Sequence, residues 1–539
     1  MTRHDDRPRF TRRGFLSGMA GAAGLAGLGG PGGPGMAEAS TSGDLGRVGE
    51  SFEVRRRAAE HARKRGMAAL TANGDEERLP NRIACYSKGL PHGAGGEPDR
   101  KAYDVLLKAL RSGDPEDFER IPLGGFVKLA NPQAAFAYEL IGPDGCQVEL
   151  APAPAFDSAA QAGELVELYW HALLRDVPFV EYGSHPLVRK AAEDLSHLSD
   201  FRGPKTPESL LRGGWSGAGA GDLAGPYVSQ FLLKPIPFTP IRVEQKIRTA
   251  VPGLDFMTDW DEWLGIQNGK IAGVNRFDTQ ARYIRNGRDL GEYVHRDFTY
   301  QAFLGACLMA LKLGTLADGG NPYKHSRTQS GFTTFGQPYL FYLIAVVTQT
   351  ALKACWYQKW MVHRRLRPEE MGGRVEAHAR KLAEYPLHAD LLGSAAVEEV
   401  RSRFGSALLP QAYPEGCPTH PSYPAGHAVI AGACVTALKA CLDESHELPE
   451  TVVASADGLS LLPWQGPPLT VGGELDKLAG NIAYGRNFAG IHWRSDATEG
   501  LRLGEAVAIE VLEEMRFTGN ELFAGFSLRR FDGTRVSVG

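Results

Sequence analysis

Cysteine is scarce in this chain of 539 residues, and its seven cysteines form no C-x-x-C pair. The small, odd number excludes a dense disulfide framework, and the spacing gives little support to a structural zinc or dithiol redox site. Cys434 and Cys441 lie seven residues apart in an apolar helical pattern. We therefore expect both to behave as small buried hydrophobic residues.

The chain also lacks a large excess of charge of either sign, because it has 59 Lys and Arg residues and 63 Asp and Glu residues. The net charge of −4 gives no general attraction for nucleic acid or for an anionic membrane surface. Hydrophobic residues at 43% and charged residues at 23% are ordinary for a soluble globular protein. The composition therefore argues against a disordered chain and a polytopic membrane protein, and we expect no nucleic-acid partner and no membrane span.

Strand patterns are few, and no internal repeat or long linker divides the chain. Residues 147–150 form a short strand pattern, whereas 202–225 and 314–331 carry breaker residues and predict long loops. Apolar residues recur at helical spacing in six segments: 159–174, 298–313, 338–363, 375–385, 427–442 and 497–515. The sequence therefore predicts a mostly α-helical protein with substantial loops.

The first 39 residues have the features of an export signal. Arg12 and Arg13 precede small and apolar residues in a stretch too short and too Gly-rich for a comfortable membrane span, and residues 37–39 supply an A-x-A cleavage pattern. This segment resembles a twin-arginine signal, and the alternative is a disordered basic tail. We expect a signal at 1–39, a helical scaffold with loops at 40–300, and a helical region that carries the site at 301–539. The protein would then be periplasmic or extracellular.

Three short segments carry the chemistry, and the first contains Lys359 and Arg367. Lys359 lies toward the end of an apolar helical pattern, while Pro368 forces Arg367 into an extended turn. An ammonium group beside a planar guanidinium suits a tetrahedral oxyanion. The alternative is a solvated basic face, because further charge lies nearby at His363, Arg364 and Arg365.

The second segment runs from His420 to His427. Pro424 is well placed for a helix start, so Gly426 and His427 fall in the first turn, where free backbone N–H groups favour an anion. His427 can exchange a proton near neutral pH. The alternative is a Pro-rich helix start with two incidental surface histidines.

In the third segment Arg486 precedes His492 by six residues, and Asp496 follows His492 by four. The carboxylate of Asp496 can bond one imidazole nitrogen of His492 and leave the other basic. His492 is therefore a candidate ligand or nucleophile. The alternative is that Asp496 caps the next helix in a capping box with Glu499.

Taken together, the three segments resemble the vanadium-dependent haloperoxidases and their acid phosphatase relatives. The family pattern is a Lys followed by Arg-Pro, then P-S-G-H, then Arg-x5-His-x3-Asp. The matching residues are Lys359, Arg367, Pro368, Pro424, Gly426, His427, Arg486, His492 and Asp496. The eight-residue step from Lys359 to Arg367 and the frame His-Pro-Ser-Tyr-Pro from His420 resemble the algal and bacterial haloperoxidase branch of this superfamily.

The resemblance implies a complete site. His492 would be the metal ligand, with Asp496 behind it, and His427 would be the acid–base group. The other cofactor contacts would come from Lys359, Arg367, Arg486 and the Gly426 N–H. The cofactor would be vanadate, in a site that phosphate can also occupy, and the partners would be hydrogen peroxide, a halide and a small organic substrate of terpenoid or aromatic type. The family fold of two four-helix bundles is implied in the same way, and we expect a homo-oligomer.

One residue departs from the family pattern, because Ala425 stands where the family has the serine before Gly-His. The lost hydroxyl removes a donor to a charged group, which is worth on the order of 1.5–3 kcal/mol. The expected function is a vanadate-dependent chloro- or bromoperoxidase. Two alternatives remain: a phosphatase-like hydrolase with His492 as nucleophile, and a homologue with weakened vanadate use that catalyses a non-redox reaction such as isomerisation.

Overall fold

The computed structural model describes residues 41–214, 221–315 and 318–538. The predicted export signal at 1–39 lies outside them. The chain divides into two compact units, of which the first ends at Glu53 and the second begins at Val54. All of the predicted site residues belong to the second unit, and the domain boundary predicted near residue 300 stays a prediction.

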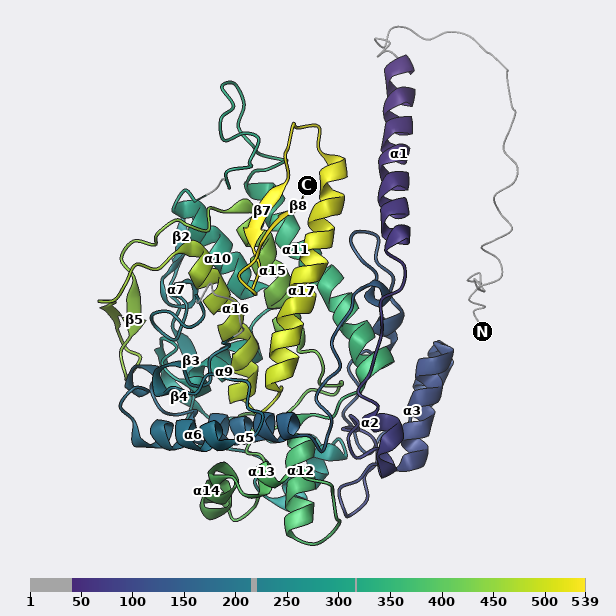
Figure 1. Cartoon of the computed structure of the whole chain (residues 1–539), viewed down its shortest axis with the longest axis vertical. Helices are drawn as coiled ribbons and strands as arrows, with labels where there is room; N and C mark the ends of the chain where they lie inside the picture. The colour runs from purple at the N-terminus through teal and green to yellow at the C-terminus, as the bar shows by residue number, and fades with distance from the viewer. Residues whose placement is uncertain (1–40, 215–220, 316–317, 539) are drawn as a thin grey trace, which may run out of the picture. The chain divides into compact units, whose positions relative to one another are not determined.

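Helices dominate the second unit (Figure 1). In the first half of the chain the helices are α1 (Thr41–Arg65), α2 (Asp75–Arg78), α3 (Arg100–Ser112), α4 (Pro115–Glu119), α5 (Ala159–Leu174), α6 (Pro186–His197), α7 (Gln230–Leu233), α8 (Trp260–Gln267) and α9 (Gly287–Arg296). In the second half they are α10 (Gln301–Lys312), α11 (Gln337–Tyr357), α12 (Pro368–Ala379), α13 (Ala389–Leu392), α14 (Ala395–Phe404), α15 (Gly426–Cys441), α16 (Val471–Phe488) and α17 (Arg494–Met515).

The strands of the described residues form four antiparallel sheets of two strands each. The pairs are β1 (Ile236–Phe238) with β2 (Ile241–Val243), β3 (Ile247–Ala250) with β4 (Phe277–Arg282), β5 (Val452–Ala454) with β6 (Leu461–Pro463), and β7 (Phe526–Arg529) with β8 (Arg535–Val538). The prediction of a mostly α-helical fold is confirmed, with these short two-stranded sheets beside the helices.

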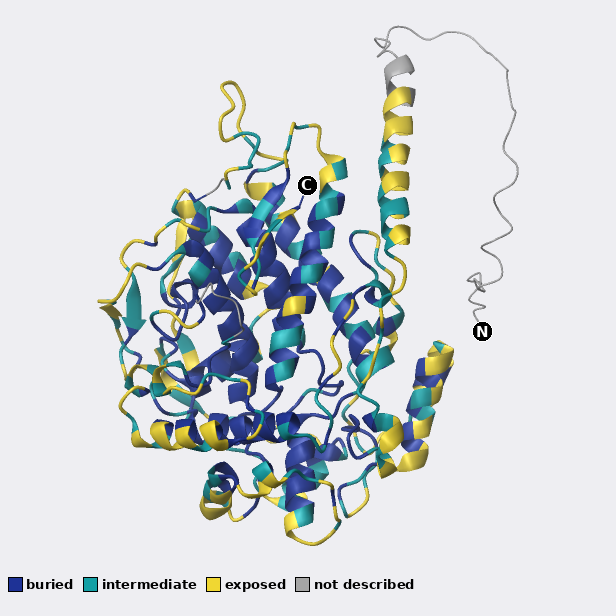
Figure 2. Ribbon diagram, in the orientation of Figure 1, coloured by how far each residue is buried: buried dark blue, intermediate teal, exposed yellow. Residues whose placement is uncertain are grey.

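The core is built around α15, which packs against α11, α16 and α17 (Figure 2). Glycine lets α15 and α17 approach closely, because a Cβ on Gly504 would lie 2.0 Å from the carbonyl oxygen of Val429. A Cβ on Gly432 would similarly lie 2.1 Å from the carbonyl oxygen of Leu501. The N-terminal ends of α15 and α17 and the C-terminal end of α16 carry two of the three predicted site segments.

Two predicted elements differ from the structure. The segment 375–385 was expected to be a helix, but α12 begins at Pro368 and ends at Ala379. Gly372 and Gly373 are poor helix formers, so the sequence pattern gives no helix signal for the first turns of α12. A Cβ on Gly373 would lie 2.0 Å from the Trp263 ring, so close packing requires glycine there. The segment 147–150 is not a strand, because the Val148 carbonyl accepts from the Gln358 side chain at 2.9 Å rather than from a partner strand.

The longest apolar helical stretch is Gln337–His363, which by length and composition alone could cross a membrane. Half of its most apolar window is buried inside the protein, and α11 packs against α15 and α17. These contacts are those of a core helix. The expected absence of a membrane span stays a prediction.

All seven cysteines are free. Cys434 is buried as predicted, and its Sγ lies 3.1 Å from the Thr348 hydroxyl, whereas Cys441 is only partly buried. The breaker-rich segments 202–225 and 314–331 are loops with short turns wherever the structure describes them, as predicted.

Candidate active site

The first segment places Lys359 inside the protein, beside the second predicted segment. Helix α11 continues as a π-helical turn, Gln358–His363, and Lys359 is fully buried within it. Its Nζ donates to the carbonyl oxygens of Pro421 and Ser422 at 2.8 and 2.7 Å. Burial lowers the pKa of Lys359 to about 7, and the neighbouring charges of Arg367 and Arg486 lower it further.

Arg367 lies where the chain leaves this turn and enters α12. Its backbone is extended, with φ −82° and ψ 157°, as Pro368 predicts. The buried guanidinium donates through Nε to the carbonyl oxygen of His420 at 2.9 Å and through Nη1 to that of Ile491 at 3.1 Å. Burial, reinforced by Arg486, lowers the pKa of Arg367. Both cations thus use backbone carbonyls rather than carboxylates.

The second segment begins α15. Gly426 is its first residue, and Ala425 is the N-cap, which offers no side-chain hydrogen bond to the helix. Free N–H groups of a first turn point out along the helix axis. A Cβ built on Gly426 would meet only the Trp356 ring, at 3.8 Å, so this backbone borders open space. The predicted helix start is confirmed.

His427 is the most exposed of the predicted side chains, at 30%, and lies in the same first turn. Its Nε2 lies 3.1 Å from a carboxylate oxygen of Asp297, the residue that ends α9. His427 is therefore held by an acid partner from a distant part of the chain, at a place that solvent reaches.

The third segment joins α16 to α17. Nδ1 of His492 lies 2.7 Å from Oδ2 of Asp496, and both side chains are buried. Burial lowers the pKa of His492 well below its ordinary value, and Arg367 and Lys359 lower it further. The neutral ring therefore donates Nδ1–H to Asp496 and keeps the Nε2 lone pair, which is the form that binds a metal.

Asp496 is not the helix cap that the alternative reading required. Helix α17 begins at Arg494 after an N-cap at Trp493, so Asp496 lies within the first turn. Its carboxylate accepts from the Trp493 backbone N–H at 3.2 Å and from Arg365 Nη1 at 2.8 Å, besides His492. The capping box with Glu499 is therefore wrong, and the pairing with His492 is present.

Arg486, near the end of α16, completes the buried cations. Its Nη1 donates to the carbonyl oxygen of Val294 at 3.0 Å, and its guanidinium lies 5.6 Å from the centre of the Tyr413 ring. Its buried Nε has no hydrogen-bond partner among the described residues. A buried donor that is left unpartnered is costly, and a bound acceptor removes that cost.

Comparison with known proteins agrees with this arrangement. Residues 339–520 match the family model described as the VCPO second helical-bundle domain. A vanadium-dependent bromoperoxidase from Ascophyllum nodosum is 36% identical over 84% of this chain and 86% of its own length, and one from Corallina officinalis is 34% identical over 91% and 98%. The solved structure of a homohexameric vanadate-dependent bromoperoxidase from A. nodosum superposes with a TM-score of 0.87 at 30% identity, over 97% of this chain and 95% of that one.

The chain belongs to the vanadium-dependent haloperoxidase family. These similarities extend over nearly the whole chain and favour neither the hydrolase nor the non-redox alternative. The recognition of a haloperoxidase from the three motifs is confirmed.

The residues of this haloperoxidase fit a vanadate ion. Among the described residues, Lys359, Arg367 and Arg486 form no ion pair with a carboxylate, and the charge of Asp496 is engaged by Arg365. Buried positive charge without a counter-ion is unstable, so the pocket favours a multivalent oxyanion. The oxyanion would also accept from the unpartnered Nε of Arg486 and from the backbone N–H of Gly426, beside which only the Trp356 ring is packed.

The basic residues beside Arg367 are not a solvated face in this haloperoxidase. Arg365 binds Glu164 and Asp496 at 3.0 and 2.8 Å, and Arg364 pairs with Glu76. The His363 ring packs edge-on against Tyr423. Arg364 and Arg365 thus support the site from outside, and their ion pairs with carboxylates distinguish them from Lys359 and Arg367.

Sequence reasoning missed three supporting residues. Ser422 donates to Asp496, Arg365 fixes the same carboxylate, and Asp297 holds His427. Ser422 and Arg365 lie inside the recognised motifs. Asp297 lies in no motif and precedes His427 by 130 residues, so no local signal indicates it.

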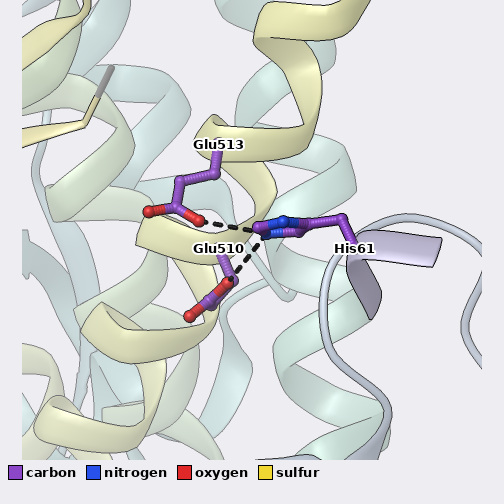
Figure 3. A group of neighbouring side chains, drawn as sticks. All are labelled: His61, Glu510 and Glu513. Atoms are coloured by element: carbon purple, nitrogen blue, oxygen red, sulfur yellow. Dashed lines mark hydrogen bonds and ion pairs between the residues drawn. The ribbon is translucent and has the colours of Figure 1, made fainter. Parts of the chain in front are cut away.

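A second cluster of histidine and acidic side chains lies apart from this site (Figure 3). His61 Nε2 lies 3.9 Å from Glu510 and 3.2 Å from Glu513, with the two carboxylates on α17. Arg65 donates to the same Glu510 oxygen at 2.6 Å and to Glu514 at 3.2 Å. Arg65 pairs with two of these glutamates and His61 contacts the third, so the cluster is an ion-pair network between α1 and α17.

Proposed function

We propose that this protein is a vanadate-dependent haloperoxidase that oxidises bromide with hydrogen peroxide and halogenates a small organic substrate. The observation that carries the proposal is His492, whose Nε2 is left unprotonated by the bond from Nδ1 to Asp496 and faces the Arg367 guanidinium, a buried cation that lacks a carboxylate partner among the described residues. The names of the similar proteins support bromide as the halide.

Vanadate would be held by His492 and by the positive groups around it. Nε2 of His492 supplies the metal ligand, and Asp496 fixes the ring through Nδ1. The oxyanion charge is balanced by Lys359, Arg367 and Arg486, with the Gly426 N–H as a neutral donor. When bound, vanadate supplies the Lewis acidity that makes hydrogen peroxide an electrophilic oxygen donor without a change in metal oxidation state.

The overall reaction balances as hydrogen peroxide, halide and one proton giving hypohalous acid and water. The hypohalous acid then replaces a C–H hydrogen of the organic substrate with halogen, and the hydrogen leaves in water. His427 is placed to move the proton, because Asp297 holds one ring nitrogen and the side chain is partly exposed.

The lysine with a lowered pKa has a separate role in binding. Before an anion binds, Lys359 is only partly charged at neutral pH, since its pKa is about 7. An arriving oxyanion favours the charged form, so binding draws a proton onto Nζ. Because Lys359 is partly neutral before an anion binds, the free protein buries less unpaired positive charge.

We also propose that the chain is exported by the twin-arginine route and assembles as a homo-oligomer. The paired arginines at 12 and 13 support export. The homohexameric bromoperoxidase that superposes over 97% of the chain supports assembly. Light scattering of the purified protein, together with cell fractionation, tests both.

The function is tested by loading the purified protein with vanadate and measuring peroxide-dependent bromination of phenol. Release of phosphate from p-nitrophenyl phosphate, with no peroxide present, is measured on the same sample. We expect bromination that requires vanadate, peroxide and bromide together. Phosphate release without vanadium-dependent bromination would support the hydrolase instead.

A further inference from the structure

A cavity of about 270 Å³ lies beside the acid–base pair of His427 and Asp297. It is bounded by the paired strands β3 and β4 and the C-terminal end of α9, and Asp297 is part of its wall. Its size is close to the lower end of the range for small-molecule sites. His427 of the predicted vanadate site is therefore hydrogen-bonded to a residue of the cavity wall.

The wall of the cavity suits an aromatic ring. The Phe277 ring has the Arg248 guanidinium 4.3 Å from its centre and that of Arg296 at 5.3 Å, and Tyr293 lines the same space. Ring faces and guanidinium planes stack favourably on aromatic ligands.

One of the two guanidinium groups in the cavity wall has no ion-pair partner among the described residues. Nε of Arg296 donates to Glu292 at 3.0 Å, and Asp297 is engaged by His427. The exposed side chain of Arg248 makes no hydrogen bond or ion pair within the described part of the chain. An anionic group on a ligand would meet Arg248 as its free partner.

We propose that this cavity binds the organic substrate, and that the substrate is an electron-rich aromatic ring carrying a carboxylate. This rests on the proposed function, because halogenation of such a ring needs the electrophilic halogen formed from peroxide and halide. A ring carbon forms a bond to halogen as the O–halogen bond of hypohalous acid breaks, and the ring proton leaves with hydroxide as water. The carboxylate binds Arg248, and the ring lies against Phe277.

Binding is tested without any chemistry. Calorimetric titration of 4-hydroxybenzoate into the protein, with neither vanadate nor peroxide present, measures the cavity alone. In Arg248→Met the affinity should fall about ten-fold, the low end for a lost bond to a charged group at an exposed site. Arg248→Lys should keep most of it. The matched control is Arg242→Met, because Arg242 is an exposed arginine of the neighbouring β2 strand that pairs with Glu244 outside this cavity.

Product ratios test whether the bound ring is the one halogenated. The vanadate-loaded protein receives equal amounts of 4-hydroxybenzoate and 4-hydroxybenzyl alcohol with bromide and peroxide. We expect a higher share of brominated benzoate than free hypobromite gives, and the Arg248→Met ratio should equal that of hypobromite. Equal binding by wild type and Arg248→Met, an absence of saturable binding, or a wild-type ratio equal to that of hypobromite would each overturn the proposal. A protein that binds 4-hydroxybenzoate but forms no hypobromite would contradict the proposed function, not the cavity.

Discussion

Nη1 of Arg367 lies 3.0 Å from Nε2 of His492, the ring nitrogen that Asp496 leaves free. The guanidinium thus covers the proposed metal ligand. Because the guanidinium lies directly beside this nitrogen, an oxyanion bound to Nε2 would also accept a hydrogen bond from Arg367. Binding of vanadate is therefore expected to shift Arg367 away from the ring and onto an oxyanion oxygen.

The variant His492→Ala should abolish retention of vanadium. It removes the only proposed metal ligand, and the helices around it keep their packing. Vanadium per chain is measured after dialysis, and circular dichroism checks the fold. Stoichiometric vanadium in a folded His492→Ala protein would show that the ligand is another residue.

The variant His427→Ala should retain vanadium but lose turnover, because His427 is placed to transfer protons and not to coordinate. A loss of about 10²–10⁴-fold in the bromination rate is typical for removal of a general acid–base group. Vanadium content and rate are measured on the same preparation. Equal loss of vanadium in the His427 and His492 variants would contradict this division of roles.

The proposed cofactor-binding residues come from motifs, because each of the three segments has a local signature. Lys359, Arg367 and Gly426 are placed by helix ends and a proline, all of which are local effects. Helix α5 could be predicted with its observed bounds for the same reason, as a capped apolar stretch. Asp297 could not be predicted, since its pairing with His427 depends on how α9 and α15 pack.

Packing also explains the helix that was predicted with the wrong bounds. Gly372 and Gly373 lower helix propensity near the start of α12, but Gly372 lies against Leu409 and Gly373 against Trp263, where a larger side chain would clash. The sequence pattern shows that glycine lowers the helix propensity of this segment, but it does not show the tertiary packing that stabilises the helix.

Ala425→Ser should tighten vanadate by about ten- to a hundred-fold, since a hydroxyl donor to a charged group is worth about 1.5–3 kcal/mol. Residue 425 is the N-cap of α15, beside the N–H groups that face the pocket. A serine there has a second option, which is to cap the helix by accepting from a first-turn N–H. Vanadate titration and thermal melting of both proteins distinguish these two roles of the serine. Tighter vanadate binding means that the hydroxyl donates to the oxyanion, whereas unchanged affinity with a raised melting temperature means that it caps the helix.

Vanadate affinity should fall as the pH rises through about 7. The pKa of Lys359 is lowered to about 7 in the empty pocket, so above this pH binding must take up a proton. Lys359→Arg stays protonated throughout this range and should show only the pH dependence of vanadate itself. Dissociation constants from pH 6 to 9 are compared between the two proteins, and parallel curves would exclude Lys359 as the titrating group.

The most direct test of the central claim measures vanadium and bromide oxidation on one sample. Purified protein is titrated with vanadate, and bound vanadium and peroxide-dependent hypobromite formation are recorded at each addition. The account predicts that both rise together and saturate at the same stoichiometry, and that both are absent in His492→Ala. Bound vanadium that supports no bromide oxidation, or oxidation that proceeds without bound vanadium, would contradict it.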